Sequence, residues 1–317
     1  MNTDTSDKTI MNFADFESAT GLLPISFTND YMFRAILQKN EKVLRGLISS
    51  LLQIPYEDIK DIHIINPIII GEAITDKEFH LDTNVVLNNE KIINLEMQLL
   101  NLGNWRERSL SYLCRSFDQL NHGQTYKNIK TTIHIGILDF TLFSDSPEFY
   151  SHYQMMNTKN HRIYSDKFLL NVLDLSQIEL ATEEDKQSQL VYWAKLFKST
   201  TWEEIKSMAT ENEYVNEACK AFYTLSSDEY FRKLCYDREN YYADLRGAQE
   251  LIAEKEELIK EKEETIKEKD SVISQQHDAI KEKNSVISQQ DKTIHEIDAE
   301  NARLRQKLLD AGLDPNS

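Results

Sequence analysis

The chain has 317 residues, 40% of them hydrophobic and 9% aromatic, which is enough for a packed core plus a further segment. Its formal net charge is −17, from 36 Lys and Arg against 53 Asp and Glu. Because this charge repels nucleic acid and anionic membranes at long range unless a local basic patch or bound cations reverse it, it argues against a passive DNA-coating protein. An enzyme that binds divalent cations through carboxylates stays compatible with it.

Targeting and redox signals indicate a cytoplasmic protein. The first ten residues have neither the basic start nor the apolar run of a secretory signal. The most apolar stretch, residues 62–71, is too short to span a bilayer and contains Pro67, so no membrane partner is expected. The three cysteines, Cys114, Cys219 and Cys235, have no metal-like spacing, and their odd number is typical of reduced thiols.

The first half of the chain predicts two helices and then three strands. Residues 1–22 read as a flexible leader. A helical pattern follows, with Asn29 or Asp30 as its cap, and a second helix ends at Pro55. Strands are expected within residues 61–70, 79–87 and 91–99.

The next segments predict a buried strand between helices. Residues 106–126 have the pattern of an amphipathic helix ended by Gly123. Residues 131–143 are almost continuously apolar, which indicates a strand covered on both faces. One or two more strands are expected within 162–180 and helices within 181–246. This order predicts an α/β fold with a mixed sheet flanked by helices.

The C-terminal segment has a heptad pattern. Isoleucine recurs every seven residues, at Ile252, Ile259, Ile266, Ile273, Ile280, Ile287 and Ile294. No Gly or Pro interrupts residues 248–311, so we expect one heptad-repeat helix over 247–310, about 95 Å long, and a disordered tail over 311–317.

The heptad helix leaves two interpretations open. Its apolar stripe favours a homo-oligomeric coiled coil through residues 248–310. The positions three residues after each isoleucine are polar, however, as at Lys262 and Gln276. A solvated single helix, stabilised by Glu–Lys pairs worth about 0.2–0.5 kcal/mol each, is the alternative.

The stretch "INLEMQLL", residues 93–100, places Glu96 and Gln98 on the polar face of a strand. The apolar faces of this strand and the preceding one coincide only if paired residue numbers have an even sum. A three-residue turn at residues 88–90 gives the sum 178, which sets Asp82 opposite Glu96.

Two carboxylates about 5 Å apart repel each other unless a proton or a cation lies between them. Mg²⁺ or Mn²⁺, which prefer oxygen ligands, would resolve the repulsion. The alternative is a half-exposed sheet face on which Asp82, Glu96 and Gln98 are merely hydrated.

Four blocks together resemble the PD-(D/E)XK nuclease family transposases, also called the recombination-promoting nuclease (Rpn) family. The blocks, which lie between about residues 24 and 180, are "TNDYMFRAIL", "HLDTNVVLNNEKIINLEMQ", "RERSLSYLCRSFDQLNHGQTY" and "IHIGILDFTLF". The resemblance implies a restriction-endonuclease-like core over 23–180, with 181–246 as a helical extension.

The resemblance also implies a site. Asp82 and Glu96 match the acidic residues of the motif and would bind the metal, although Leu81 stands where the family name has Pro. Gln98 stands in the Lys position and Asp30 matches a further acidic position. Arg108 and Tyr112 match substrate-binding positions, and His134 is expected to be a core histidine.

The function implied is a Mg²⁺- or Mn²⁺-dependent endodeoxyribonuclease that hydrolyses DNA phosphodiester bonds and promotes recombination or acts like a transposase. The alternative is a non-catalytic interaction protein with a remnant nuclease fold that oligomerises through its coiled coil. Whether the substrate is DNA or RNA stays open.

Overall fold

The computed structural model describes residues 14–66, 83–118, 120 and 125–312. It divides into two compact units, residues 1–246 and residues 247–317. The helices are α1 (Ala14–Ser18), α2 (Asp30–Lys39), α3 (Glu41–Leu52), α4 (Trp105–Phe117), α5 (Glu183–Gln187), α6 (Leu190–Lys198), α7 (Trp202–Ala209), α8 (Glu213–Ser227) and α9 (Glu229–Asp310). The strands are β1 (Ile62–Ile64), β2 (Thr83–Leu87), β3 (Lys91–Gln98), β4 (Thr131–Leu138), β5 (Tyr150–Gln154) and β6 (Phe168–Asp174).

The six strands form one mixed sheet in the order β1-β2-β3-β4-β6-β5. Its central strands β3, β4 and β6 are parallel, and β1, β2 and β5 join antiparallel at the two sides. Helix α4 makes the crossover between the parallel strands β3 and β4. The expected mixed sheet flanked by helices is therefore confirmed.

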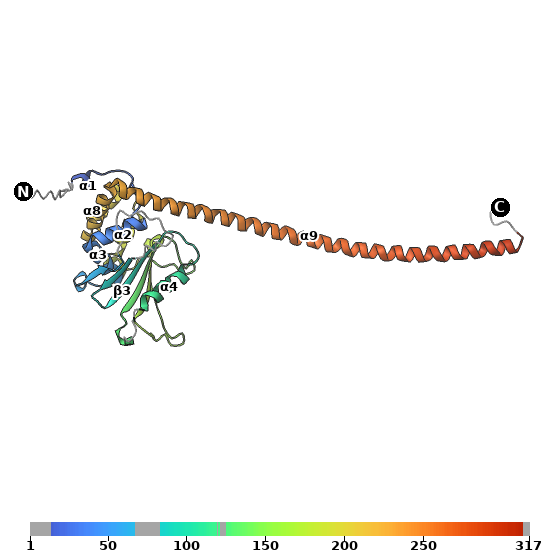
Figure 1. Ribbon diagram of the computed structural model, residues 1–317, viewed down its shortest axis with the longest axis horizontal. Helices are drawn as coiled ribbons and strands as arrows, with labels where there is room; N and C mark the ends of the chain where they lie inside the picture. The colour runs from blue at the N-terminus through green and yellow to red at the C-terminus, as the bar shows by residue number, and fades with distance from the viewer. Residues whose placement is uncertain (1–13, 67–82, 119, 121–124, 313–317) are drawn as a thin grey trace, which may run out of the picture. The chain divides into compact units, whose positions relative to one another are not determined.

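Helices cover the two faces of the sheet unequally. Side chains such as Ile93 and Ile135 pack with α2, α3, α6 and α8 in the main core. On the other face Trp105 of α4 packs with Leu138 and Val172 in a smaller cluster. Figure 1 shows α4 on the opposite side of β3 from α2 and α3. The face under α4 is the one that contains Glu96.

The β2–β3 hairpin has the register that the sequence predicts. Its pairs, among them Thr83 with Leu95 and Val85 with Ile93, all sum to 178. Asn88 and Asn89 adopt left-handed φ angles of 50° and 55° in the turn, a conformation that asparagine tolerates better than most residues.

Several expected boundaries are wrong. Helix α4 ends at Phe117 because the backbone leaves the helical region at Asp118, so Gly123, outside the described residues, does not end it. The strand expected over 131–143 ends at Leu138, and β1 covers only Ile62–Ile64 of residues 61–66. Residues 67–70 lie outside the described part.

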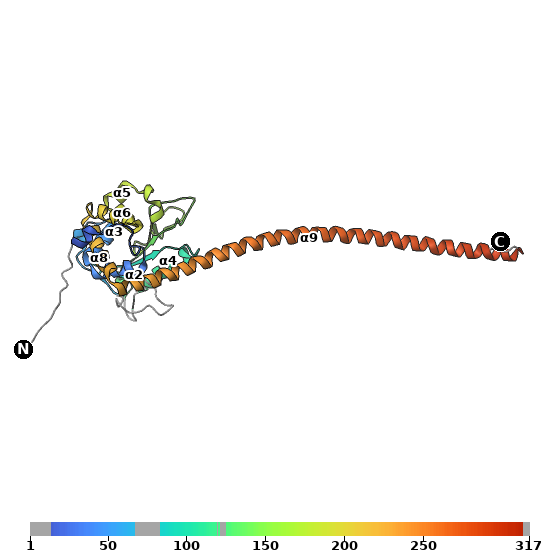
Figure 2. The same ribbon diagram turned by 90° about the horizontal axis from the view of Figure 1, so that it is seen from above.

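Helix α9 starts earlier than the heptad pattern indicates. The Asp228 side chain accepts a hydrogen bond from the Phe231 amide at 2.8 Å, which caps the helix well before residue 247. The helix is then continuous to Asp310 (Figure 1 and Figure 2). The first part of α9 therefore belongs to the sheet-containing unit, and the heptad part forms the second unit. The expected leader and C-terminal tail lie largely outside the described residues.

None of the helices in the described ranges is both long enough and apolar enough to cross a bilayer.

Gly136 lets α4 lie close to the sheet, and its replacement tests this contact. A Cβ atom at Gly136 would lie 2.2 Å from Trp105 Cζ2. We expect Gly136→Ala to lower the free energy of unfolding by roughly 1–3 kcal/mol, the usual cost of overpacking. Urea denaturation measures it. Gly247→Ala, where no heavy atom lies within 4 Å of the added carbon, is the control and should not destabilise. Equal stability of Gly136→Ala and wild type would contradict the packing argument.

Candidate active site under helix α4

The polar face of β3 is buried. Asn94, Glu96 and Gln98 are 1%, 3% and 6% exposed. The alternative of a half-exposed, hydrated face is therefore wrong for Glu96 and Gln98, because α4 covers this side of the sheet. Burying a carboxylate costs several kcal/mol unless a counter-charge and hydrogen bonds compensate it, so the surroundings of Glu96 decide what the site is.

Arg108 of α4 supplies the counter-charge. Its Nη2 lies 2.6 Å from Glu96 Oε1, and the Arg108 side chain keeps 32% of its surface exposed whereas Glu96 keeps 4%. The guanidinium carbon also lies 5.4 Å from the centre of the Tyr112 ring, one turn along α4. The structure thus brings Glu96, Arg108 and Tyr112 together, with the positive group at the boundary between the buried face and solvent.

A row of polar side chains crosses β2, β3 and β4 beside Glu96. Asn84 pairs with Asn94 and Asn94 with His134 in the sheet register. Asn94 Nδ2 donates to Asn84 Oδ1 at 2.7 Å, and Asn94 Oδ1 lies 2.5 Å from His134 Nδ1. Because that oxygen only accepts, His134 Nδ1 carries the proton. This fixes the tautomer and leaves Nε2 with its lone pair.

His134 is neutral. It is fully buried, and burial together with the positive charge of Arg108 lowers its pKa to about 3. Its Nε2 lies 3.6 Å from Glu96 Oε2, so this contact between two acceptors is not an ion pair. Within the described part of the chain, His134 Nε2 has no hydrogen-bond partner. The expected core histidine is thus in the core, but it faces the candidate site.

The remaining predicted residues are placed differently. Gln98 Nε2 donates to the Leu100 carbonyl at 2.9 Å. Asp82 lies outside the described residues. Asp30 is 5% exposed and is held by the base of α9: Arg238 Nη2 lies 2.7 Å from its Oδ2, and the Tyr242 hydroxyl donates to the same oxygen at 2.7 Å. None of the contacts described for Asp30 involves Glu96.

The Asp30 carboxylate changes the pKa values of its two partners, Arg238 and Tyr242. Burial disfavours the charged form of Arg238, but the hydrogen bond and charge of Asp30 outweigh it and raise the Arg238 pKa. Burial, followed by the charge of Asp30, raises the pKa of Tyr242. Both groups therefore keep their protons at neutral pH. Next to this pair, Asn29 Nδ2 donates to the Cys235 carbonyl at 3.0 Å, so the "ND" dipeptide fastens α2 to α9.

The donors for a divalent cation are incomplete in what the structure describes. No group of three or more His, Cys, Asp or Glu side chains suited to a metal occurs among the described residues. The buried Glu96 carboxylate and the unpartnered His134 Nε2 nevertheless face each other. An oxygen and a nitrogen donor are both types of ligand that a divalent ion accepts.

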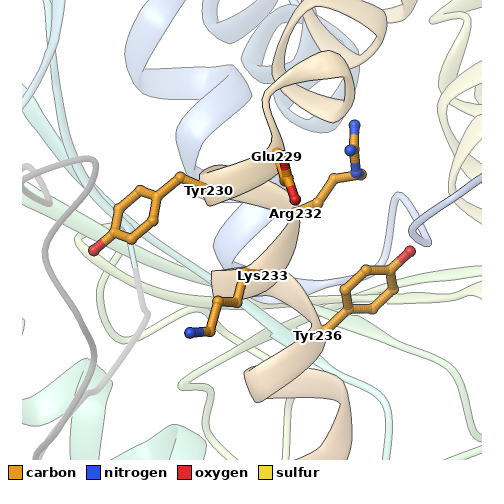
Figure 3. Close-up of a pocket in the computed structure, with 5 residues that line it drawn as sticks. All are labelled: Glu229, Tyr230, Arg232, Lys233 and Tyr236. Carbon is orange, nitrogen blue, oxygen red and sulfur yellow. The ribbon is translucent and has the colours of Figure 1, made fainter.

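A shallow hollow on α9 contains no comparable pair of metal-binding side chains. It lies along the first two turns of α9 and is lined by Glu229, Tyr230, Arg232, Lys233 and Tyr236. Tyr230 and Lys233 point to one side of the helix and Arg232 and Tyr236 to the other, so these side chains diverge (Figure 3). The hollow shares no residue with the Glu96 face.

Sequence reasoning predicted Arg108 as a site residue but missed the polar neighbours of Glu96 on β2 and β4 and the partners of Asp30. The hairpin register could have placed Asn84 opposite Asn94. The neighbourhood of His134, however, depends on the parallel pairing of β3 with β4, and no local turn fixes that pairing. Arg238 and Tyr242 are more than 200 residues from Asp30 in the chain, and only the long-range packing of α9 brings them together.

The Asp30–Arg238 pair can be tested by stability measurements. Arg238→Gln leaves a buried carboxylate without its counter-charge, so we expect the free energy of unfolding to fall by about 3 kcal/mol. Tyr242→Phe removes one hydrogen bond and should cost about 1 kcal/mol. Lys233→Gln on the exposed side of the same helix is the control. If Arg238→Gln is as stable as Lys233→Gln in urea denaturation, the pair does not hold α9 to α2.

In a comparison with protein families, the family described as PD-(D/E)XK nuclease family transposase matches residues 27–253, more than half of the chain. No curated protein and no solved structure matches the chain. The matched region contains the sheet, α4 and the first part of α9. The chain belongs to the PD-(D/E)XK nuclease family transposases.

Proposed function

We propose that the protein is a Mg²⁺- or Mn²⁺-dependent endonuclease that hydrolyses DNA phosphodiester bonds and thereby promotes recombination or acts like a transposase. Family membership supports a nuclease. The observation that carries the proposal is the buried Glu96, which lies under α4 with Arg108 at its solvent side. The three free cysteines suit the cytoplasm as its location.

The proposed metal ligands are Asp82 and Glu96. If the hairpin register of 178 continued by one pair beyond Thr83 and Leu95, Asp82 would lie opposite Glu96. When bound, the ion would lower the pKa of a water molecule and stabilise charge on the phosphoryl oxygens. A hard divalent cation also offsets the mutual repulsion of two acidic groups, which the protein alone would have to relieve by protonation.

Other residues would bind and orient the substrate. The guanidinium of Arg108 is partly exposed and can hold a phosphate through two parallel hydrogen bonds, and Tyr112 lies beside it. Gln98 has a neutral amide where the motif has Lys. It can orient a water molecule or the phosphate by hydrogen bonding, but it adds no positive charge. Asp30 would act indirectly, since Arg238 and Tyr242 hold its carboxylate.

A plasmid-nicking assay tests the proposal. Wild-type protein with Mg²⁺ or Mn²⁺ should convert supercoiled plasmid to open circles, and Glu96→Gln and Asp82→Ala should lower the rate by at least about 100-fold, as expected when a preorganised catalytic group is lost. Glu90→Gln, in the exposed turn of the same hairpin, is the matched control and should keep wild-type activity. Equal residual nicking by wild type and Glu96→Gln would exclude catalysis at this face. A labelled RNA in the same assay shows which nucleic acid is cut.

We also propose that residues 248–310 assemble copies of the chain. From Glu250 to Asp310 every residue of α9 is exposed in the single chain. The isoleucine column includes Ile273 and Ile287, which are 60% and 53% exposed. A second copy that covers this stripe would remove apolar surface from water at about 25 cal/mol per Å². Such assembly would also serve the alternative function, a non-catalytic interaction protein.

Light scattering coupled to gel filtration measures the assembly. Deleting residues 248–317 should lower the molar mass to that of a single truncated chain. In the full-length protein, Ile273→Glu combined with Ile287→Glu should have the same effect, because it puts charges into the apolar stripe. Ser271→Glu combined with Ser285→Glu changes the helix equally but off the stripe, so it should keep the wild-type mass. A monomeric wild type would instead support the solvated single helix.

A further inference from the structure

We infer that the end of the sheet from which the β5–β6 hairpin projects binds the backbone and the major groove of duplex DNA, to one side of the bond that is cut. The inference rests on the proposed function and names the surface that holds the substrate. A chain of net charge −17 needs a local basic patch to bind a polyanion, and this end of the sheet supplies one.

Two segments at this end of the sheet lack acidic residues. Asp and Glu make up 53 of the 317 residues, yet none occurs in residues 119–138 or 149–165. The two segments approach each other where β4 and β6 begin, because Lys167 Nζ donates to the Ile129 carbonyl at 2.7 Å and the Thr132 amide donates to the Lys167 carbonyl at 2.9 Å. The missing acids therefore leave one connected surface with positive charge.

The cations of this surface are not neutralised by carboxylates. Asp118 and Asp166 are the acidic residues that border the two segments. Within the described part of the chain, no ion pair is formed by the six cations of what we call the basic surface: Arg115, Lys127, Lys130, Lys159, Arg162 and Lys167. Cations gathered without partners raise the local positive potential, which attracts phosphates.

The β5–β6 hairpin continues beyond the sheet as a two-stranded extension, residues 155–164. The Tyr164 amide donates to the Met155 carbonyl at 3.0 Å, and the Asn157 amide donates to the Arg162 carbonyl at 2.8 Å. The extension projects past the ends of the strands, at the bottom of Figure 1. Its apolar side chains are exposed, and an apolar group that a protein leaves uncovered marks a contact surface. They are Met155, Met156, Ile163 and Tyr164.

Duplex DNA matches both the shape and the chemistry of the extension. The major groove of B-DNA admits a two-stranded β-ribbon and presents thymine methyl groups to apolar side chains. Lys159 and Arg162, in and beside the turn of the extension, are exposed and can reach the phosphates at the edges of the groove. Double-stranded RNA has a deep and narrow major groove that side chains cannot read. The extension therefore favours DNA over duplex RNA.

A stripe on α4 connects the basic surface with the candidate active site. Arg108, Tyr112 and Arg115 follow one another at helical spacing, and the centre of the Tyr112 ring lies 5.4 Å and 6.0 Å from the two guanidinium carbons. The stripe is about 10 Å long, or about three base pairs of DNA. Helix α4 then ends beside the extension's strand β6, where the ring centres of Phe117 and Phe168 are 5.3 Å apart. DNA that follows the stripe from Arg108 therefore reaches the basic surface.

Fluorescence anisotropy of a labelled DNA duplex, measured with the full-length protein in the presence of a chelator, tests the inference without cleavage. The logarithm of the binding constant falls linearly with the logarithm of the salt concentration, by about 0.9 per phosphate contact. Lys159→Gln combined with Arg162→Gln should make this slope shallower by about 2 per chain and weaken binding about tenfold or more. Tyr164→Ala should weaken binding with the slope unchanged, because it removes an apolar contact.

The matched control is Lys195→Gln combined with Lys233→Gln, which removes the same charge from exposed positions on α6 and α9 and should keep the wild-type slope. An unchanged slope in the Lys159 and Arg162 double variant, an equal loss in the control, or equal affinity for duplex RNA would each overturn the inference. If plasmid nicking persists in that case, the proposed function stands. Duplex binding at the basic surface by a wild type that does not nick plasmid would instead overturn the proposed function alone.

Discussion

The burial of the Glu96 carboxylate is the constraint on which the packing of α4 against the sheet depends. With 4% of its side chain exposed, it needs partners from outside its own strand. Arg108 reaches it from α4 and His134 faces it from β4, so the helix and the strand must both keep their places. Gly136, which pairs with Glu96 in the register, allows Trp105 to pack directly on the sheet and brings α4 close enough for that ion pair.

A second buried charge organises the other side of the sheet-containing unit. Asp30 begins α2, and Arg238 and Tyr242 of α9 meet its carboxylate. Since the first turns of α9 satisfy a buried acid of the core, they are part of the fold and not merely the start of the tail. The family match, which extends to residue 253, and the structural boundary after Arg246 agree with this division of α9. Asp30 thus has a clear structural role whatever it contributes to catalysis.

Local patterns in the sequence predicted much of the fold and part of the site. The alternation in β3 and the Asn88–Asn89 turn were enough to give the hairpin register, because a half-apolar strand permits only even sums. Strand β5 was not predicted, since Tyr150, His152 and Gln154 lack an apolar alternation and the strand pairs only with β6. The burial of Glu96 was also beyond prediction, because it depends on where α4 packs after the crossover.

The composition of the Glu96 face bears on whether this nuclease fold is active or a remnant. A buried ion pair is a poor source of stability, and well-packed apolar residues of similar volume often stabilise a fold as much or more. Here the same face holds an ion pair, a neutral imidazole and an amide row, beside a main core built almost entirely from apolar side chains. Stability alone would not require such a set of groups at one place. Chemistry at Glu96 would require it, and the partly exposed Arg108 gives that buried acid a positive group that a phosphate can also reach.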